Sequence, residues 1–187
     1  MSSQSFFHSI EITLSKPEQR IFLDTRLRLS RSFSEPVDRI MAKVLAYCHS
    51  YSPDLVFSNG KDPFEPVIFE KSLIGDYVTW TDIAVPSEKK LGKVIRAHTN
   101  PKISLYFFRE GQRAEFQREF KNLKSEYLTR LSIYEIDPKI VEHLSSNDPR
   151  HYVWQITFLE NQFYLDADKI DYESTLLKLD PYELINS

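Results

Sequence analysis

The sequence predicts an α/β (α+β) protein in which a mixed β-sheet is flanked by helices, with a β-hairpin at the N-terminus. Two observations lead to this fold class. Apolar and polar residues alternate over 6–14 and again over 21–29, which is the period of strands with one buried face. Further along, a predicted helix over 87–98 lies between two predicted strands. Because such a crossover joins parallel strands, we expect at least one parallel pair in the sheet.

The composition is that of a folded protein. The 187 residues are 41% hydrophobic and include 13 phenylalanines and 10 tyrosines, which suits a single domain over residues 1–187. No apolar run approaches the roughly 18 residues of a membrane span, and the N-terminus lacks the pattern of a signal peptide. We therefore expect a cytoplasmic protein without a membrane partner. A formal charge of −3 argues against coating nucleic acid by bulk attraction, but it leaves room for a local basic patch.

The first elements are a hairpin and a helix. Residues 15–19, which contain a proline and polar residues, separate the two alternating segments and predict a hairpin turn. From Ser34 the apolar residues recur at helical spacing as far as Cys48. Ser34 suits the N-cap, and Glu35 with Pro36 suits the first turn. Cys48 falls among the apolar positions, which predicts a small buried hydrophobe.

The remaining elements are predicted from the same two patterns, which are the alternation typical of strands and the apolar spacing typical of helices. After a short apolar run at 55–57, we expect strands at 65–69, 76–84, 103–108 and 127–134, helices at 87–98, 112–124 and 138–144, and a hairpin formed by 150–159 and 162–166. Residues 73–76 predict the reversal between two of these strands. The tail over 169–187 carries little periodic signal.

The residues that could carry chemistry are dispersed. The sequence contains no glycine-rich phosphate loop, paired-cysteine zinc site or nucleophile elbow. It does place Asp82 on a strand just before a helix with Lys89, Lys90 and Lys93. A carboxylate that can bind a divalent cation, beside a lysine that can orient water or offset phosphate charge, is what metal-assisted phosphodiester chemistry needs. Alternatively, Asp82 caps a turn and the lysines form the solvated face of an amphipathic helix.

Further charged residues have two interpretations. Glu35 is either a site residue or a partner of the helix dipole. Glu65 precedes a proline ahead of a predicted strand. Arg26 and Arg28 lie on one face of the second predicted strand with Arg31 just beyond it, and these arginines either bind phosphate or deter edge-to-edge pairing.

At these residues the chain resembles the YaeQ family of bacterial proteins, a branch of the PD-(D/E)XK nuclease-like superfamily. The resemblance covers most of residues 8–168 and rests on three blocks taken together. The blocks are Leu27-x-Leu29-x-Arg31-x-x-Ser34-Glu35-x-x-x-Arg39-x-Met41, then Glu65-Pro66 followed by Phe69, and Trp80-x-Asp82 followed by Pro86-x-Glu88-Lys89-Lys90-Leu91-x-Lys93.

The resemblance implies a PD-(D/E)XK nuclease-like core in which Glu35 and Asp82 converge on a Mg²⁺ ion. The chain departs from that pattern at two positions. The lysine of the standard motif should stand two residues after Asp82, where this chain has Ala84. The position after Pro66, which is acidic in similar proteins, is Val67. Valine cannot bind Mg²⁺, and Glu65 could substitute only if the strand were bulged.

Two functional hypotheses follow. The first is a nuclease-like protein that binds nucleic acid or a phosphorylated ligand and hydrolyses phosphodiesters with Mg²⁺. The second is a catalytically inactive regulatory or binding protein that keeps the fold, and Val67 with Ala84 favours it. For the first, the catalytic candidates are Glu35, Asp82, Lys90 and Lys93, the metal ligands Asp82, Glu35 and Glu65, and the substrate contacts Arg31, Arg39, Trp80 and Lys89.

Overall fold

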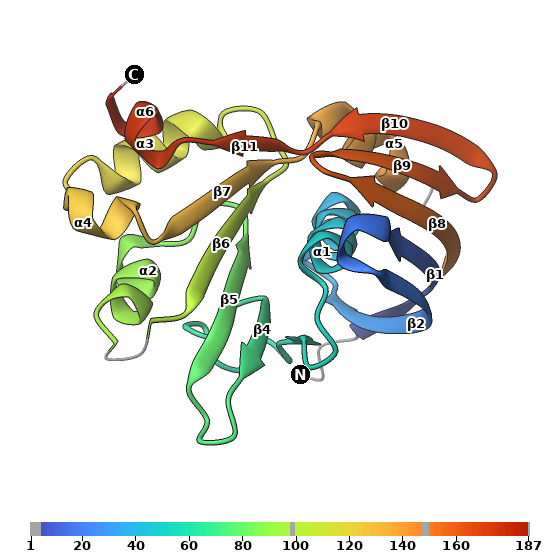
Figure 1. The fold of residues 1–187 in the computed structure, drawn as a ribbon, viewed down its shortest axis with the longest axis horizontal. Helices are drawn as coiled ribbons and strands as arrows, with labels where there is room; N and C mark the ends of the chain where they lie inside the picture. The colour runs from blue at the N-terminus through green and yellow to red at the C-terminus, as the bar shows by residue number, and fades with distance from the viewer. Residues whose placement is uncertain (1–4, 98–99, 147–149, 187) are drawn as a thin grey trace. The chain divides into compact units, whose positions relative to one another are not determined.

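The structure is a computed structural model, and it describes residues 5–97, 100–146 and 150–186 (Figure 1). The chain divides into two compact units. Unit 1 consists of Met1–His49 and Asp137–Leu176, and unit 2 of Ser50–Ile136 and Leu177–Ser187. The expectation of a single domain over residues 1–187 stays a prediction.

Unit 1 contains a five-stranded mixed sheet in the order β10-β9-β8-β1-β2. β1 pairs antiparallel with β2 and parallel with β8, and β9 pairs antiparallel with both β8 and β10. Both predicted hairpins are therefore confirmed. The elements are β1 (Ser5–Lys16), the 3-10 helix η1 (Pro17–Gln19), β2 (Ile21–Ser32), α1 (Val37–Ser50), α5 (Pro138–Ser146), β8 (His151–Leu159), β9 (Gln162–Ala167) and β10 (Ile170–Thr175).

Helix α1 begins at Val37, so the prediction of Ser34 as its N-cap is wrong. The backbone N–H of Glu35 donates to the carbonyl of Ser32 at 3.0 Å, which places Glu35 in a turn ahead of the helix. The reason is Pro36, because a residue that precedes proline is disfavoured in the helical conformation.

The end of α1 packs on the sheet of unit 1. Cys48 in this stretch is 0% exposed, which confirms that it is a small buried hydrophobe. Lys16 of β1 donates from its ammonium group to the carbonyl of His49 at 2.5 Å. The His49 ring lies 5.4 Å from that of Phe158 in β8. These contacts fix the last turn of α1 against β1 and β8.

Unit 2 contains a six-stranded mixed sheet in the order β11-β7-β6-β5-β4-β3. Strands β5, β6 and β7 are parallel to one another, which confirms the parallel pair predicted from the crossover helix. The elements are β3 (Val56–Phe57), β4 (Ile68–Lys71), β5 (Tyr77–Ile83), α2 (Glu88–Ile95), β6 (Lys102–Phe107), α3 (Gln112–Phe120), α4 (Ser125–Leu128), β7 (Leu131–Glu135), β11 (Leu177–Leu179) and α6 (Pro181–Asn186).

Four details of the two units differ from the prediction. The chain has two mixed sheets where one was expected. The strand predicted over 127–134 begins only at Leu131, because α4 occupies the residues before it, and the helix predicted over 112–124 ends at Phe120. The tail beyond residue 169, which carried little signal, contributes β10, β11 and α6.

Helix α2 is held by its apolar face. Leu91, Val94 and Ile95 are buried in one cluster with Trp80 of β5 and Ile103 of β6. Burial of these side chains stabilises the helix far more than its intrinsic propensity can over eight residues. The opposite, lysine-bearing face is thereby turned to solvent. No helix within 5–97, 100–146 or 150–186 has the length and apolar character needed to cross a membrane.

Candidate functional site

Asp82 lies near the end of β5 and is only 3% exposed. Its carboxylate lies 2.6 Å from the ammonium group of Lys90 on α2. The carboxylate also accepts a hydrogen bond of 3.1 Å from the backbone N–H of Ile83. A buried carboxylate is costly unless a partner offsets its lost hydration, and Lys90 supplies that partner.

Lys90 is positioned by the start of α2. Ser87 is the N-cap, and its hydroxyl accepts from the backbone N–H of Lys90. The Lys90 side chain is 14% exposed, and its ammonium group lies 5.6 Å from the centre of the Trp80 ring. The structure therefore brings together three of the predicted site residues, Asp82, Lys90 and Trp80. Trp80 itself is 1% exposed and belongs to the core.

Ala84, which stands at the place of the motif lysine, has a left-handed backbone with φ of 76°. Its N–H donates to the carbonyl of Tyr106 at 2.8 Å, so the turn is anchored to the neighbouring strand. A non-glycine residue rarely adopts this conformation. The chain thus leaves the extended geometry of β5 directly after Ile83.

Val67, at the position of the expected acid, lies beside the strand that carries Asp82. Its N–H donates to the carbonyl of Thr81 at 3.0 Å. Glu65, the possible substitute, is held elsewhere, since it accepts from the Ser58 hydroxyl and lies 4.0 Å from the Lys71 ammonium group. The irregularity in this strand pair falls between Glu70 and Lys71, where it does not reorient Glu65.

These contacts do not make a Mg²⁺ site in unit 2. Magnesium prefers several oxygen ligands, and here Asp82 is neutralised by Lys90 while Val67 offers a hydrocarbon. Nowhere in the described ranges do three or more His, Cys, Asp or Glu side chains gather closely enough to hold a metal ion.

A second cluster of predicted residues lies in unit 1. The Glu35 carboxylate is 3.4 Å from the Arg39 guanidinium and also pairs with the Lys43 ammonium group. Arg31, half-buried, lies near the end of β2. Because Glu35 and Asp82 belong to different units, their convergence on one metal stays a prediction.

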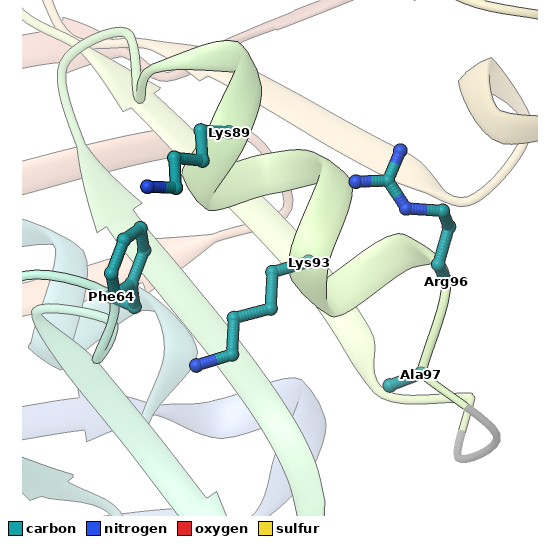
Figure 2. A pocket seen from close by; sticks show the side chains of 5 residues that line it. All are labelled: Phe64, Lys89, Lys93, Arg96 and Ala97. Atoms are coloured by element: carbon teal, nitrogen blue, oxygen red, sulfur yellow. The ribbon is translucent and has the colours of Figure 1, made fainter.

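The remaining two lysines of α2 line a pocket of about 470 Å³, which is bounded by Phe64, Lys89, Lys93, Arg96 and Ala97 (Figure 2). The ammonium groups of Lys89 and Lys93 lie 5.1 Å and 4.9 Å from the centre of the Phe64 ring. Among the described residues, no carboxylate forms a salt bridge with Lys89, Lys93 or Arg96.

Sequence reasoning missed Phe64 and Arg96. Arg96 could have been found, because Lys89, Lys93 and Arg96 recur at the spacing of one helix face, opposite the apolar face. Phe64 lies in a loop 25 residues before Lys89 in the chain, and no local pattern connects the two. Lys93, predicted as catalytic, thus lines this pocket with Lys89.

Residues 1–176 match the family model described as YaeQ protein. The chain belongs to the YaeQ family. It is 23% identical over 180 residues to the uncharacterized protein YaeQ of Escherichia coli K12, a match that covers 94% of this chain and 96% of that protein. The Shigella flexneri YaeQ protein matches to the same extent. The family predicted from three sequence blocks is therefore confirmed.

Two crystal structures of YaeQ proteins share the fold. The protein from Pseudomonas syringae has a TM-score of 0.80 and 24% identity, with coverage of 94% of this chain and 96% of that one. The protein from Xanthomonas axonopodis pv. citri has a TM-score of 0.82 and 19% identity, with coverage of 94% and 98%. These likenesses support the mixed α/β architecture of this YaeQ chain.

Proposed function

We propose that this chain binds a phosphorylated ligand, nucleic acid foremost, on the lysine-bearing face of α2, and that it acts as a binding or regulatory protein. The observation that carries the proposal is the pocket in which Lys89, Lys93 and Arg96 lie without a carboxylate partner among the described residues. Lysine ammonium and arginine guanidinium groups are the usual partners of phosphate oxygens in proteins.

The surroundings of Asp82 favour binding over hydrolysis. A metal-dependent nuclease needs a carboxylate that is available to the ion, but Asp82 is 2.6 Å from the Lys90 ammonium group. The second acid expected beside it is Val67, and the motif lysine is Ala84 in a left-handed turn. Each difference removes part of the hydrolytic machinery and leaves the cationic face of α2 intact.

The alternative is a divalent-metal-dependent nuclease of the PD-(D/E)XK type. One observation supports it, which is that a buried carboxylate at the end of a central strand is paired with a lysine of the crossover helix. Under this alternative, Asp82 and Lys90 would stand where a nuclease-like core places its acid and base.

The test is a binding and cleavage assay on one set of oligonucleotides. Single- and double-stranded DNA and RNA are titrated into the protein and followed by fluorescence anisotropy, without metal and then with Mg²⁺ or Mn²⁺. The Lys89→Ala/Lys93→Ala double variant should weaken binding by about tenfold or more, since each charge-assisted contact contributes about 1.5 kcal/mol or more. Lys124→Ala, which removes a lysine whose side chain is 73% exposed in the same unit, should change nothing.

The outcomes separate the two functions. Binding without strand cleavage supports the proposal. Metal-dependent cleavage that is lost in Asp82→Ala would establish the nuclease alternative. Absence of binding to every oligonucleotide would contradict both.

A further inference from the structure

We infer that the pocket between Phe64 and α2 accepts a phosphate monoester, as found at the phosphorylated end of a nucleic-acid strand or on a free nucleoside monophosphate. This inference rests on the proposed function and narrows it. The site would recognise a terminal phosphate, whereas a phosphodiester within a strand would bind weakly there.

The charge of the pocket fits a monoester. Three cationic side chains, Lys89, Lys93 and Arg96, line a space of about 470 Å³. A phosphate monoester carries a charge of about −1.5 to −2 at neutral pH, whereas each internal phosphodiester carries one negative charge. A pocket with three positive charges offsets the larger and more compact charge better.

Phe64 holds the two lysine side chains in place. Both ammonium groups lie about 5 Å from the centre of the same ring, within the range of cation–π attraction. A turn holds the backbone at Phe64, because the Phe64 N–H donates to the Asp62 carboxylate at 2.8 Å and the Glu65 N–H donates to the Asp62 carbonyl at 3.1 Å. Free lysine side chains lose rotamer entropy when they bind a ligand, and this arrangement reduces that loss.

Arg96 packs beside a glycine. Figure 2 shows the Lys89 and Lys93 side chains extending toward Phe64, whereas the Arg96 guanidinium lies on the other side of α2 in that view and turns back toward Gly92. A Cβ atom at Gly92 would lie 3.0 Å from one terminal nitrogen of Arg96 and 3.3 Å from its central carbon. The guanidinium therefore lies against Gly92, and a larger residue there would require its flexible end to shift by a few tenths of an ångström. The planar fork of the guanidinium can donate two hydrogen bonds to one phosphate group.

The rest of the chain disfavours a long polyanion. The formal net charge is −3, so phosphates that extend beyond the basic face of α2 have no general attraction to the protein. A terminal phosphate requires only the local charge of the pocket.

The experiment compares oligonucleotides of one sequence that carry a 5′-phosphate, a 3′-phosphate or hydroxyl groups at both ends. We expect at least one phosphorylated end to bind about tenfold more tightly than the hydroxyl ends, which corresponds to one good charge-assisted contact. Nucleoside monophosphate, the matching nucleoside and inorganic phosphate then serve as competitors. If the monophosphate competes as well as the oligonucleotide end, the ligand is a free nucleotide, and if it competes less well, the ligand is a strand end.

Matched variants tie this preference to the pocket. Phe64→Leu keeps apolar bulk but removes the ring, and it should reduce the preference several-fold, whereas Phe64→Trp should retain it. Arg96→Gln removes the guanidinium but keeps a long polar side chain, and it should also reduce the preference, because Arg96 lines the pocket. Thermal unfolding of each variant verifies that it is folded, and Lys124→Ala is the charge control.

Two results would overturn the inference in distinguishable ways. Equal binding of phosphorylated and hydroxyl ends would reject the monoester pocket and leave the proposed function standing. A preference for phosphorylated ends that survives in both Phe64→Leu and Arg96→Gln would place the recognition elsewhere. Failure of every oligonucleotide to bind would reject the inference together with the proposed function.

Discussion

The contact between Asp82 and Lys90 has two interpretations, as an ion pair that stabilises the fold and as part of a catalytic site. The two charged groups are 2.6 Å apart, and both side chains are mostly buried, with 4% and 14% exposure. Breaking one side of a buried pair costs more than replacing both sides with neutral groups, because it leaves an uncompensated charge. Stability measurements can therefore show what the pair contributes to folding, separately from any ligand.

Lys90→Met should lower the free energy of unfolding by about 3 kcal/mol, since it leaves the Asp82 carboxylate buried without this cation. Asp82→Asn with Lys90→Met should recover most of the loss. Urea unfolding of both single variants and the double variant measures the coupling between the two residues. A double variant that is no more stable than Lys90→Met would contradict an ion pair of this kind.

Cys48 provides a second prediction at the level of one residue. Burial raises the pKa of its thiol to about 12, although the nearby Lys16 ammonium group lowers it in part. An unfolded thiol ionises near pH 8.5, so above that pH the unfolded chain loses a proton that the folded chain keeps. The corresponding stability is complete below about pH 8.5 and is lost as the pH rises toward 12.

The free energy of unfolding should therefore fall more steeply above about pH 9 in the native protein than in Cys48→Ala, by up to about 1.4 kcal/mol per pH unit. Denaturant unfolding at a series of pH values measures both slopes. Parallel curves for the two proteins would show that Cys48 does not contribute.

Helix α2 is the element on which both parts of the site depend. One face carries Leu91, Val94 and Ile95 into the core, and the first turns carry Lys89, Lys90 and Lys93. The N-cap at Ser87 fixes where these turns begin. A change in the cap should therefore affect stability and ligand binding together.

Ser87→Ala should destabilise the protein by about 1 kcal/mol, because the N–H of Lys90 loses its acceptor, whereas Ser87→Asp should preserve stability. Chemical denaturation of the two variants measures the difference. Equal losses in both would mean that the serine hydroxyl is not the cap.

Helices and strands could be predicted where their sequence pattern involves only neighbouring residues. The hairpins and α2 followed from alternation and helical spacing, which are properties of neighbouring residues. The four-residue α4 was missed because it is shorter than two helical turns. The start of α1 was misplaced because Pro36 disfavours the helical conformation in the residue before it, which the spacing of apolar residues does not show.

The residues of the candidate site were also predictable only where their signal is local in the sequence. Lys89, Lys90 and Lys93 were found because they share a helix that the sequence predicts. Phe64 was not, because its contact with α2 joins two segments that are remote in the chain. The pairing of Asp82 with Lys90 was likewise decided by how α2 packs on β5, a tertiary effect that no local pattern contains.

At the scale of the whole molecule, an acidic chain carries a local basic face. The formal charge is −3, while three cationic side chains line one pocket of α2. Nucleic-acid binding through bulk attraction engages many phosphates, and its affinity falls steeply with salt. The affinity of a ligand that binds only in this pocket should depend only weakly on the salt concentration.

For single-stranded oligonucleotides we expect the logarithm of the affinity to fall with the logarithm of the salt concentration at a slope of about −0.7, as for one neutralised phosphate. Anisotropy titrations at several salt concentrations measure it. A slope several times steeper would show that phosphates outside the pocket dominate binding.

The left-handed turn at Ala84 also limits what a substitution at this position could add beside Asp82. Side chains two residues apart share a face only while the backbone stays extended, and the chain departs from that geometry at φ of 76°. A lysine introduced at position 84 would therefore not extend beside Asp82 as it would along a continuous strand. A lysine in that geometry would require a change in backbone path at position 84 as well as the substitution itself.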